Sequence, residues 1–283
     1  MNAQLQLIEP AAGQLEVRQP DGRPLFCYVY APTTPEREAP RPYCHPVYSI
    51  DGDVVTNHRP NDHPWHHGLS LTLTSVGGTN FWGGPSYHAG EGYRWREDHG
   101  VQVHREWLHR DPEHLEHRLE WRALASQELL LLETRSLRPQ LHPDGWSLEW
   151  TSRLQNVADR DLRCDNYHSA GGLEGSHYTG LQFRGARGLL DDHGDETIGV
   201  GIEGGAKGEA AVHGTSARWL EWQTQHDTSL RRTRIRFEAE HALPWFVRRN
   251  LPLVAFAAHR EQPLHLPRDV RWSFTHRVGF FRA

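Results

Sequence analysis

Apolar and polar residues alternate with a period of two along most of the chain. Segments of this kind are LSLTLTS (69–75), VQVHREW (101–107), LEHRLEWRA (115–123), WSLEWTSRL (146–154), ARWLEW (217–222), TRIRFEAE (233–240) and VRWSFTHRV (270–278). This alternation is typical of β-strands with one face in a core and the other in solvent. Two continuous apolar runs, 25–31 and 251–258, predict strands that are covered on both faces.

Turn-forming residues separate the alternating segments at intervals of roughly 8 to 15 residues. We find no amphipathic helix longer than ten residues. The pattern predicts an all-β fold, a large antiparallel β-sandwich of about 14 to 18 strands. No repeat, linker or low-complexity tract divides the sequence, so a single β-sandwich domain is expected over residues 1–283.

Two loop-rich zones interrupt the strand pattern, at residues 56–95 and 165–180. The first of them contains the strand at 69–75. Loops at one end of a rigid sandwich frequently carry the functional residues, because they vary without disturbing the core. Candidate chemistry is therefore sought in these two zones.

Composition excludes several classes of protein. The net charge of −5 gives no basic surface for nucleic acid or anionic lipid. No apolar run approaches the ~20 residues that span a bilayer, and the N-terminal residues lack the pattern of a signal peptide. Three cysteines without C-x-x-C spacing predict reduced thiols in a cytoplasmic protein. The 21 histidines point instead to acid/base chemistry or metal binding.

The densest group of histidines lies in HRPNDHPWHHG, residues 58–68. Its prolines argue against a helix or a central strand, so the segment is expected to form a loop before the strand at 69–75. One interpretation is a site for zinc, iron or manganese, with His63, His66 and His67 as ligands and Asp62 as a further carboxylate. The alternatives are acid/base use of one or two of these histidines without a metal, and a purely structural role.

The second loop zone, DNYHSAGGLEGSHYTG, combines His168 with Glu174 and Asn166. A histidine and a carboxylate at one site can act as an acid and a base of different pKa. The structural alternative is a turn-rich connection in which Asn166 and Glu174 cap backbone groups.

The glycine-rich segment GGTNFWGGPSYH contains Asn80 and Trp82. Aromatic rings between glycines suit stacking against the apolar face of a sugar, although the same rings could fill the sandwich core. Arg41, Arg59 and Arg184 are forked donors suited to hydroxyls or a carboxylate. No G-x-G-x-x-G turn, Walker loop or G-x-S-x-G elbow is found, so nucleotide cofactors and serine esterase chemistry are not expected.

The segment RPYCHPVYSIDGDVVTNHRPNDHPWHHGLSL, followed by GGTNFW, resembles a bacterial family labelled PmoA-like or "methane oxygenase PmoA". The similarity continues through YTGLQFRG and PLHLPRDVRWSFTHRV and so covers most of the chain. Members of that family are associated with sugar catabolism. The resemblance implies a carbohydrate ligand, and we place the matching Arg41, His45, Arg59 and Asp62 among the substrate-binding residues.

A second segment, WTSRLQNVADRDLRCDNYHSAGGL, is similar in layout to the aldose 1-epimerase (galactose mutarotase) superfamily. This resemblance implies a galactose mutarotase-like β-supersandwich with His168 as a catalytic histidine. Its partner would come from the histidines of residues 63–67. A late carboxylate would be Glu238 or Glu261, and Glu174 is an alternative nearer in sequence.

The sequence thus predicts a carbohydrate-active enzyme, an isomerase or lyase that uses histidine acid/base chemistry in epimerisation, mutarotation or elimination. The expected partner is a small-molecule carbohydrate or sugar acid, and a homodimer is left open. Two alternatives remain. One is a carbohydrate-binding protein without catalysis, and the other is a zinc or non-haem iron enzyme built on the histidines of residues 63–67.

Overall fold

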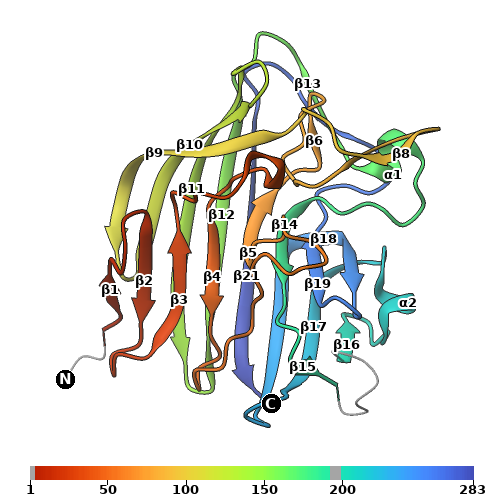
Figure 1. Ribbon diagram of the computed structural model, residues 1–283. Helices are drawn as coiled ribbons and strands as arrows, with labels where there is room; N and C mark the ends of the chain where they lie inside the picture. Colours follow the sequence, from red (N-terminus) through yellow and green to blue (C-terminus); the bar gives the residue numbers. More distant parts are fainter. Residues whose placement is uncertain (1–3, 192–198) are drawn as a thin grey trace.

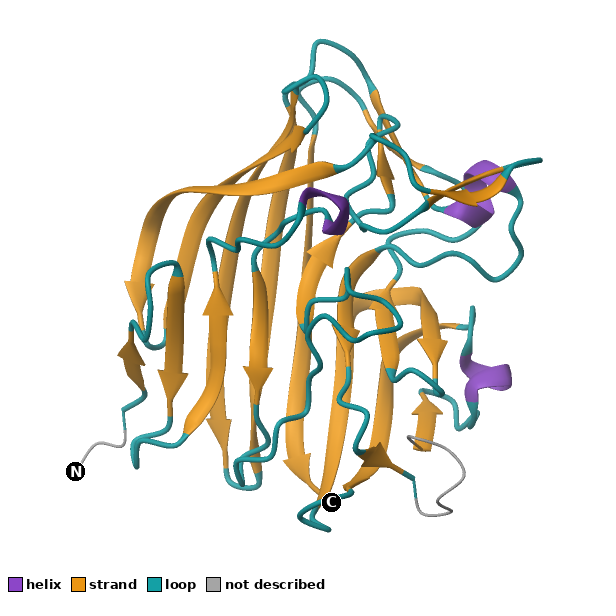
Figure 2. Ribbon diagram, in the orientation of Figure 1, coloured by secondary structure: helices purple, strands orange, loops and turns teal. Residues whose placement is uncertain are grey.

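The computed structural model describes residues 4–191 and 199–283. Within these residues, 16 strands form one antiparallel sheet that curls into a near-barrel (Figure 1 and Figure 2). In spatial order, the main path is β1 (Gln6–Ile8), β2 (Gln14–Arg18), β3 (Pro24–Val29), β4 (Tyr43–Val47), β5 (Leu69–Thr72), β14 (Gly180–Arg184), β19 (Leu253–Phe256), β18 (Arg232–Arg248), β21 (Arg271–Arg282), β12 (Gly145–Asn156), β11 (Leu129–His142), β10 (His114–Ala123) and β9 (Gly100–Asp111).

The remaining elements are short or lie beside this path. β17 (Ser216–His226) pairs with β18 and with the short strands β15 (Leu189–Leu190) and β16 (Gly199–Ile202). Two small sheets contain β20 (Leu264–Leu266), β13 (Leu162–Asp165) and β6 (Ser75–Val76), and β7 (Ser86–His88) with β8 (Gly92–Arg94). The helical turns are η1 (Glu36–Glu38), α1 (Tyr167–Gly171) and α2 (Glu209–Val212). None of the helices in the described ranges is long and apolar enough to cross a membrane.

The prediction of an all-β antiparallel fold is confirmed. Each alternating segment contains a strand, and so do both continuous apolar runs. The run at β3 is covered on both faces, as expected, because Phe26 and Tyr28 face the core while Cys27 and Val29 are buried on the opposite side. The period of two therefore reports which side chains enter the core.

The long strand β18 joins the two layers of the sandwich. Its residues 233–239 pair with β21, and its residues 245–248 pair with β19. The strand bends between these two stretches, which brings the layer of β2–β5 over the layer of β9–β12 (Figure 1). The space between the layers is filled by one large apolar cluster with tryptophans among its largest buried side chains, namely Trp121, Trp146, Trp150, Trp222 and Trp245.

A charged network crosses this core. Arg135 and Glu133 are both fully buried, and their closest N–O distance is 2.8 Å. Glu133 also accepts hydrogen bonds from Trp121 Nε1 and Ser152 Oγ, at 2.7 and 2.6 Å. Buried ions are tolerated only when they are paired and fully hydrogen-bonded, and this network meets that condition.

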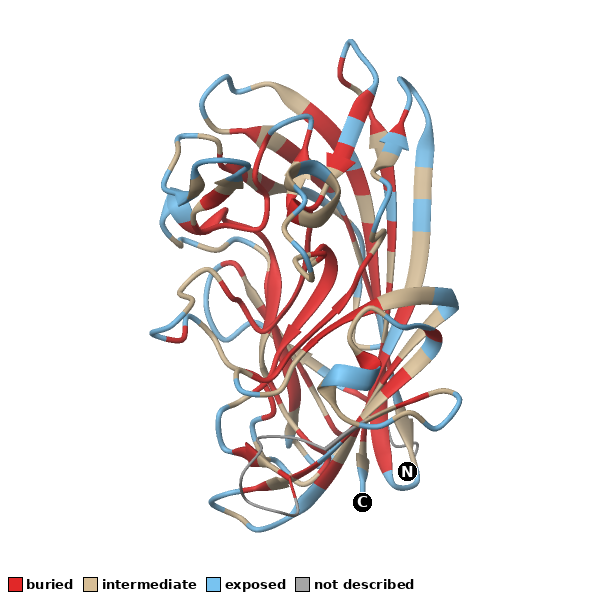
Figure 3. Ribbon diagram, turned by 90° about the vertical axis from the view of Figure 1, so that its right-hand side faces the viewer, coloured by how far each residue is buried: buried red, intermediate tan, exposed pale blue. Residues whose placement is uncertain are grey.

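The outer face of β5 and β14 is polar but buried. Ser70 and Thr72 on β5, and Gln182 and Arg184 on β14, have no exposed surface. Loops from residues 36–42 and 56–68 and the segment around Trp82 lie over this face, and Figure 3 shows buried residues both in the sheet and in the loops. The candidate site lies on this covered polar face.

Candidate functional site

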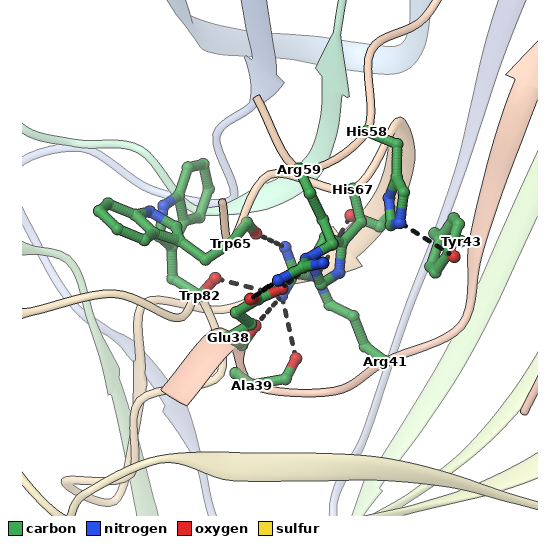
Figure 4. Close-up of polar contacts among 10 residues, drawn as sticks. Glu38, Ala39, Arg41, Tyr43, His58, Arg59, Trp65, His67 and Trp82 are labelled. Atoms are coloured by element: carbon green, nitrogen blue, oxygen red, sulfur yellow. Dashed lines mark hydrogen bonds and ion pairs between the residues drawn. The ribbon is translucent and has the colours of Figure 1, made fainter. Parts of the chain in front are cut away.

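Glu38 is the centre of a polar cluster on the covered face (Figure 4). The turn η1 places its carboxylate in a position that is only 1% exposed. Arg59 donates to both carboxylate oxygens, with Nη2–Oε1 at 2.8 Å and Nε–Oε2 at 2.9 Å. His67 Nε2 lies 3.1 Å from Oε2. Burial would raise the pKa of Glu38, but the hydrogen bonds from His67 and Arg59 outweigh it, so the pKa lies below its ordinary value.

His67 is held as a neutral imidazole with one bare nitrogen. Burial lowers its pKa to about 3, so the ring is uncharged at neutral pH. An ionised carboxylate can only accept hydrogen bonds, so the single ring proton of His67 sits on Nε2, toward Glu38. Nδ1 is buried and has no hydrogen-bond partner among the described residues. It is a free proton acceptor oriented by a carboxylate.

Further rings extend the cluster toward the surface. The His58 ring lies 5.1 Å from the His67 ring and is stacked on Tyr43 at 4.6 Å. The Tyr43 hydroxyl lies 3.3 Å from His58 Nε2. The His45 ring also stacks on His58, with centroids 5.3 Å apart. Burial lowers the pKa of His45 and His58 to about 4 and raises that of Tyr43 to about 12, so all of these groups are neutral at neutral pH.

Local backbone geometry explains why these side chains meet. Tyr43 and His45 are two residues apart on β4 and so point to the same face. His58 and His67 are antiparallel bridge partners, which places their side chains side by side. Between them, Arg59 has a positive φ of 48°, a left-handed conformation that is costly for a residue with a side chain. This backbone position lets the Arg59 side chain reach Glu38.

Arg41 joins the backbone segments that surround the cluster. Its guanidinium has no exposed surface and donates to the backbone carbonyls of Glu38, Ala39, Trp65 and Trp82 at 2.8–3.1 Å. Burial lowers its pKa to about 9, which still leaves it charged at neutral pH. Arg41 therefore ties three loops together, and its donors are committed to protein groups.

The structure separates the histidines of residues 63–67 into two groups. His66 and His67 are adjacent in a strand-like segment and point to different partners: His66 Nδ1 lies 3.2 Å from Arg184 Nη1, whereas His67 contacts Glu38. His63 stacks on His66 at 4.7 Å and also contacts Asp62 at 2.8 Å. Within the described residues no group of three or more His, Cys, Asp or Glu side chains could hold a metal ion.

The other predicted residues have partners outside the Glu38 cluster. Arg184 has no exposed surface and binds Asp62 with Nη2–Oδ2 at 2.9 Å. His168 pairs at 2.7 Å with Glu261, one of the two predicted late carboxylates. The other late carboxylate, Glu238, binds Arg236 instead, and Glu174 is exposed on its loop.

Both predicted asparagines are used by the protein itself. The Asn80 amide accepts from the backbone of Trp82 and Gly83 and donates to Ser86. Asn166 caps α1 and also donates to backbone carbonyls of the 259–260 segment. Trp82 is 4% exposed and contacts the His66 and Tyr178 rings, so it is largely a packing residue.

One family model covers nearly the whole chain. It is described as a family of unknown function (DUF6807), and it matches residues 16–282. The chain belongs to this family. The resemblances to the PmoA-like family and to the galactose mutarotase superfamily are therefore wrong as assignments, because the match carries neither name. No curated protein matches the chain.

The sequence does not predict three central residues of this DUF6807 protein. Glu38 lies in the loop APTTPEREAP, where nothing distinguishes it from Glu36. His58 opens the histidine-rich stretch, and Tyr43 lies in the RPY segment, but neither has a spacing that predicts a site. The one usable signal was that strand geometry sends adjacent histidines to opposite faces, so that His67 needed a partner other than that of His66.

Lowered histidine pKa values predict a pH-dependent stability. Burial lowers the pKa of seven histidines to about 4 or about 3: His45, His58, His213, His259, His67, His177 and His276. The unfolded chain binds these protons near its ordinary pKa of about 6.5, whereas the folded protein does not. The contribution of these histidines to the free energy of unfolding is therefore expected to be complete above a pH of about 6.5 and to decrease as the pH falls toward about 4.

Denaturant midpoints measured from neutral pH down to about pH 4.5 test this expectation. His259→Gln should weaken the dependence, because both ring nitrogens of His259 are buried without a partner in the described structure. A midpoint that stays constant over the range would contradict the burial of these neutral rings.

Proposed function

We propose that this DUF6807 protein is an enzyme that transfers protons on a carbohydrate or sugar-derived acid, with His67 as the base. The observation that carries the proposal is the Glu38–His67 hydrogen bond, which leaves a neutral imidazole with its Nδ1 bare. A carboxylate that fixes the tautomer of a histidine and stabilises its cation is the arrangement that general-base catalysis requires.

The proposed step removes a proton from a substrate carbon that lies next to a carbonyl or carboxyl group. The proton moves to His67 Nδ1, and the electron pair of the C–H bond moves onto the substrate oxygen as an enolate. The hydrogen bond from His67 to Glu38 offsets part of the cost of burying the resulting imidazolium. Epimerisation follows when water delivers a proton to the opposite face and His67 releases its own proton to solvent, whereas elimination follows when His67 gives its proton to a neighbouring hydroxyl that leaves as water.

Groups near His67 suit the oxygen that gains charge. The Tyr43 hydroxyl is neutral because burial raises its pKa to about 12, and neutral phenols and imidazoles are hydrogen-bond donors to an enolate. Arg59 is 45% exposed and presents the outer side of its guanidinium to solvent. A substrate carboxylate suits this planar fork, which favours a sugar acid.

Substrate reaches His67 by displacing its cover. This cover is His58, whose ring centroid lies 5.1 Å from that of His67 and which is partly exposed. The left-handed backbone at Arg59 supports a functional role for this cover, because strained residues cluster at sites where they are needed.

Solvent deuterium exchange tests the proposal for epimerisation and elimination alike. Purified protein is incubated in D2O with a panel of aldoses, ketoses, aldonic acids and uronic acids, and loss of carbon-bound protons is followed by NMR. We expect exchange with at least one sugar acid, lost in His67→Gln and kept in His63→Gln, whose ring is 35% exposed and outside the Glu38 cluster. Exchange at the buffer rate for the whole panel would refute the proposal, and sugar binding without exchange would assign a carbohydrate-binding role instead.

A further inference from the structure

Strand β9 forms one edge of the large sheet (Figure 1). Among the described residues, the part of β9 that follows Gln102 pairs through its backbone with β10 alone. The register of this pairing is irregular on both sides of His117, at Glu116 and before Leu119. Segments with few buried contacts and an interrupted ladder open more readily than the core of a fold. The side chains that hold residues 104–111 therefore determine how firmly this edge is closed.

A cluster of four rings supplies these side-chain contacts. Trp107 of β9 stacks on His117 of β10 with centroids 4.9 Å apart, and His104 of β9 lies 5.1 Å from His117. Tyr30 follows β3 in the opposite layer and contacts His104 at 4.9 Å and Trp107 at 5.1 Å. The four rings therefore join the edge strand to β10 and to the opposite layer of the sandwich.

A chain of hydrogen bonds fixes the protons of the two histidines. Arg135 Nη1 lies 3.2 Å from the Tyr28 hydroxyl, and an arginine can only donate, so the Tyr28 oxygen accepts. The Tyr28 side chain has no exposed surface, and its remaining contact in the described structure is His117 Nε2 at 2.8 Å, so the hydroxyl donates to that nitrogen. His117 then carries its proton on Nδ1 and donates it to His104 Nδ1, which lies 2.9 Å away.

This chain has no place for an added proton. A proton on His104 Nδ1 would face the Nδ1–H of His117, and two donors would then meet at 2.9 Å. The opposite tautomer of His117 would turn an Nε2–H toward Tyr28, whose hydroxyl proton would lose its acceptor. A buried donor without an acceptor costs about 1–3 kcal/mol. The contact between the two histidines is therefore compatible only with neutral rings.

Within the described residues, no carboxylate favours the protonated form of either ring. The charged and titratable groups beside them on the neighbouring elements are Tyr28 and Tyr30 at β3, Arg105 and Glu106 on β9, Arg118 and Glu120 on β10, and Glu133 and Arg135 on β11. The carboxylates among these groups are paired with the arginines. The polar contacts of the two rings are with each other and with Tyr28. Burial lowers the pKa of both rings, and that of His117 lies well below its ordinary value.

We propose that the His104–His117 contact is an acid-sensitive clasp on the β9 edge, and that protonation of the two histidines releases residues 104–111 from the sandwich. In the released state both rings reach water and bind protons near the ordinary pKa of about 6.5. In the closed state they stay neutral. The free energy of this local opening is therefore complete above a pH of about 6.5 and decreases as the pH falls below it.

Hydrogen exchange of the intact protein tests the clasp. Exchange of β9 residues 104–111 and of the core strand β12 is followed by mass spectrometry from pH 7.5 to pH 5.5, with correction for the intrinsic rate at each pH. We expect β9 to be less protected than β12 at every pH. Its protection should fall about thirtyfold between pH 6.5 and pH 5.5, which is the factor for two rings that bind protons only in the open state.

Two variants assign this dependence to the clasp. His104→Asn offers an amide oxygen to His117 Nδ1 but does not titrate, so the same pH step should lower the protection of β9 only about fivefold. The matched control is His109→Asn on the same strand, where the side chain is 59% exposed, and it should behave as the unaltered protein does. An equal dependence in His104→Asn and the unaltered protein would overturn the proposal.

Nitrogen-15 NMR of the histidine rings in the unaltered protein keeps the test decisive if His104→Asn does not fold. At neutral pH we expect the His117 proton on Nδ1 and a bare Nδ1 on His104. Protonated His104 and His117 rings at pH 5.5 in a protein whose β9 stays protected would contradict the clasp. Loss of protection of β9 and β12 with the same free energy would also contradict it, because the histidines would then report global unfolding.

Discussion

Replacement of Glu133 by glutamine is expected to lower the free energy of unfolding by about 3–5 kcal/mol. Each carboxylate oxygen of Glu133 accepts two hydrogen bonds, and all of their donors lie in the core: Arg135 Nε and Ser152 on Oε1, Arg135 Nη2 and Trp121 on Oε2. The glutamine would turn an NH2 group toward these donors. It would also leave the Arg135 cation buried without its countercharge.

Guanidinium unfolding at neutral pH measures this loss, and the chain supplies a matched control. Glu106 pairs with Arg118 at 2.5 Å on the protein surface, where the two side chains are 54% and 59% exposed. Such a pair contributes about 0–1 kcal/mol, so Glu106→Gln should hardly move the midpoint. Equal effects of the two substitutions would show that the Glu133–Arg135 pair does not hold the core together.

Glu38→Gln is expected to slow deuterium exchange on the sugar-acid substrate by roughly 10²–10⁴-fold, with little effect on folding. Arg59 donates to both oxygens of Glu38 and would hold the glutamine carbonyl on its side, since both of its nitrogens reach Oε1. The glutamine NH2 would then face His67 Nε2 and donate to it. The ring proton would move to Nδ1, and the base would be lost.

The matched control for this variant is Glu36→Gln, two residues earlier on the same turn. Glu36 is exposed, and it lies outside the contacts of the cluster shown in Figure 4. Its substitution should leave the exchange rate unchanged. An unimpaired Glu38→Gln protein would mean that the carboxylate only positions loops and does not set the tautomer of His67.

The fold was largely predictable because the apolar residues that alternate along each strand are the residues that pack in the core. Along β12, Trp146, Leu148 and Trp150 alternate with polar neighbours in the sequence, and all three lie in the apolar cluster. The bend of β18 was not predictable in this way. Residues 233–239 of β18 pair with β21, and residues 245–248 pair with β19. These two partners set the point at which the strand passes from one layer to the other, and the alternation within β18 does not show it.

The site was predictable only in part, because its members meet through pairing that local sequence does not encode. The histidine-rich motif predicts His67, but its partner Glu38 lies 29 residues earlier. The buried Arg41 also links the two segments, because it donates to the carbonyls of Glu38 and Trp65. Asn80 and Asn166 show the opposite problem, since an asparagine between glycines suits a ligand and a backbone cap equally well.

The protonation state of the His67 ring tests the proposed base most directly, and it requires no substrate. Nitrogen-15 NMR of the histidine side chains at neutral pH, with His67 assigned by its loss in His67→Gln, reports which ring nitrogen carries the proton. We predict a neutral ring with the proton on Nε2, bonded to Glu38, and a bare Nδ1. A doubly protonated ring, or a proton on Nδ1, would contradict the role of His67 as a base oriented by Glu38.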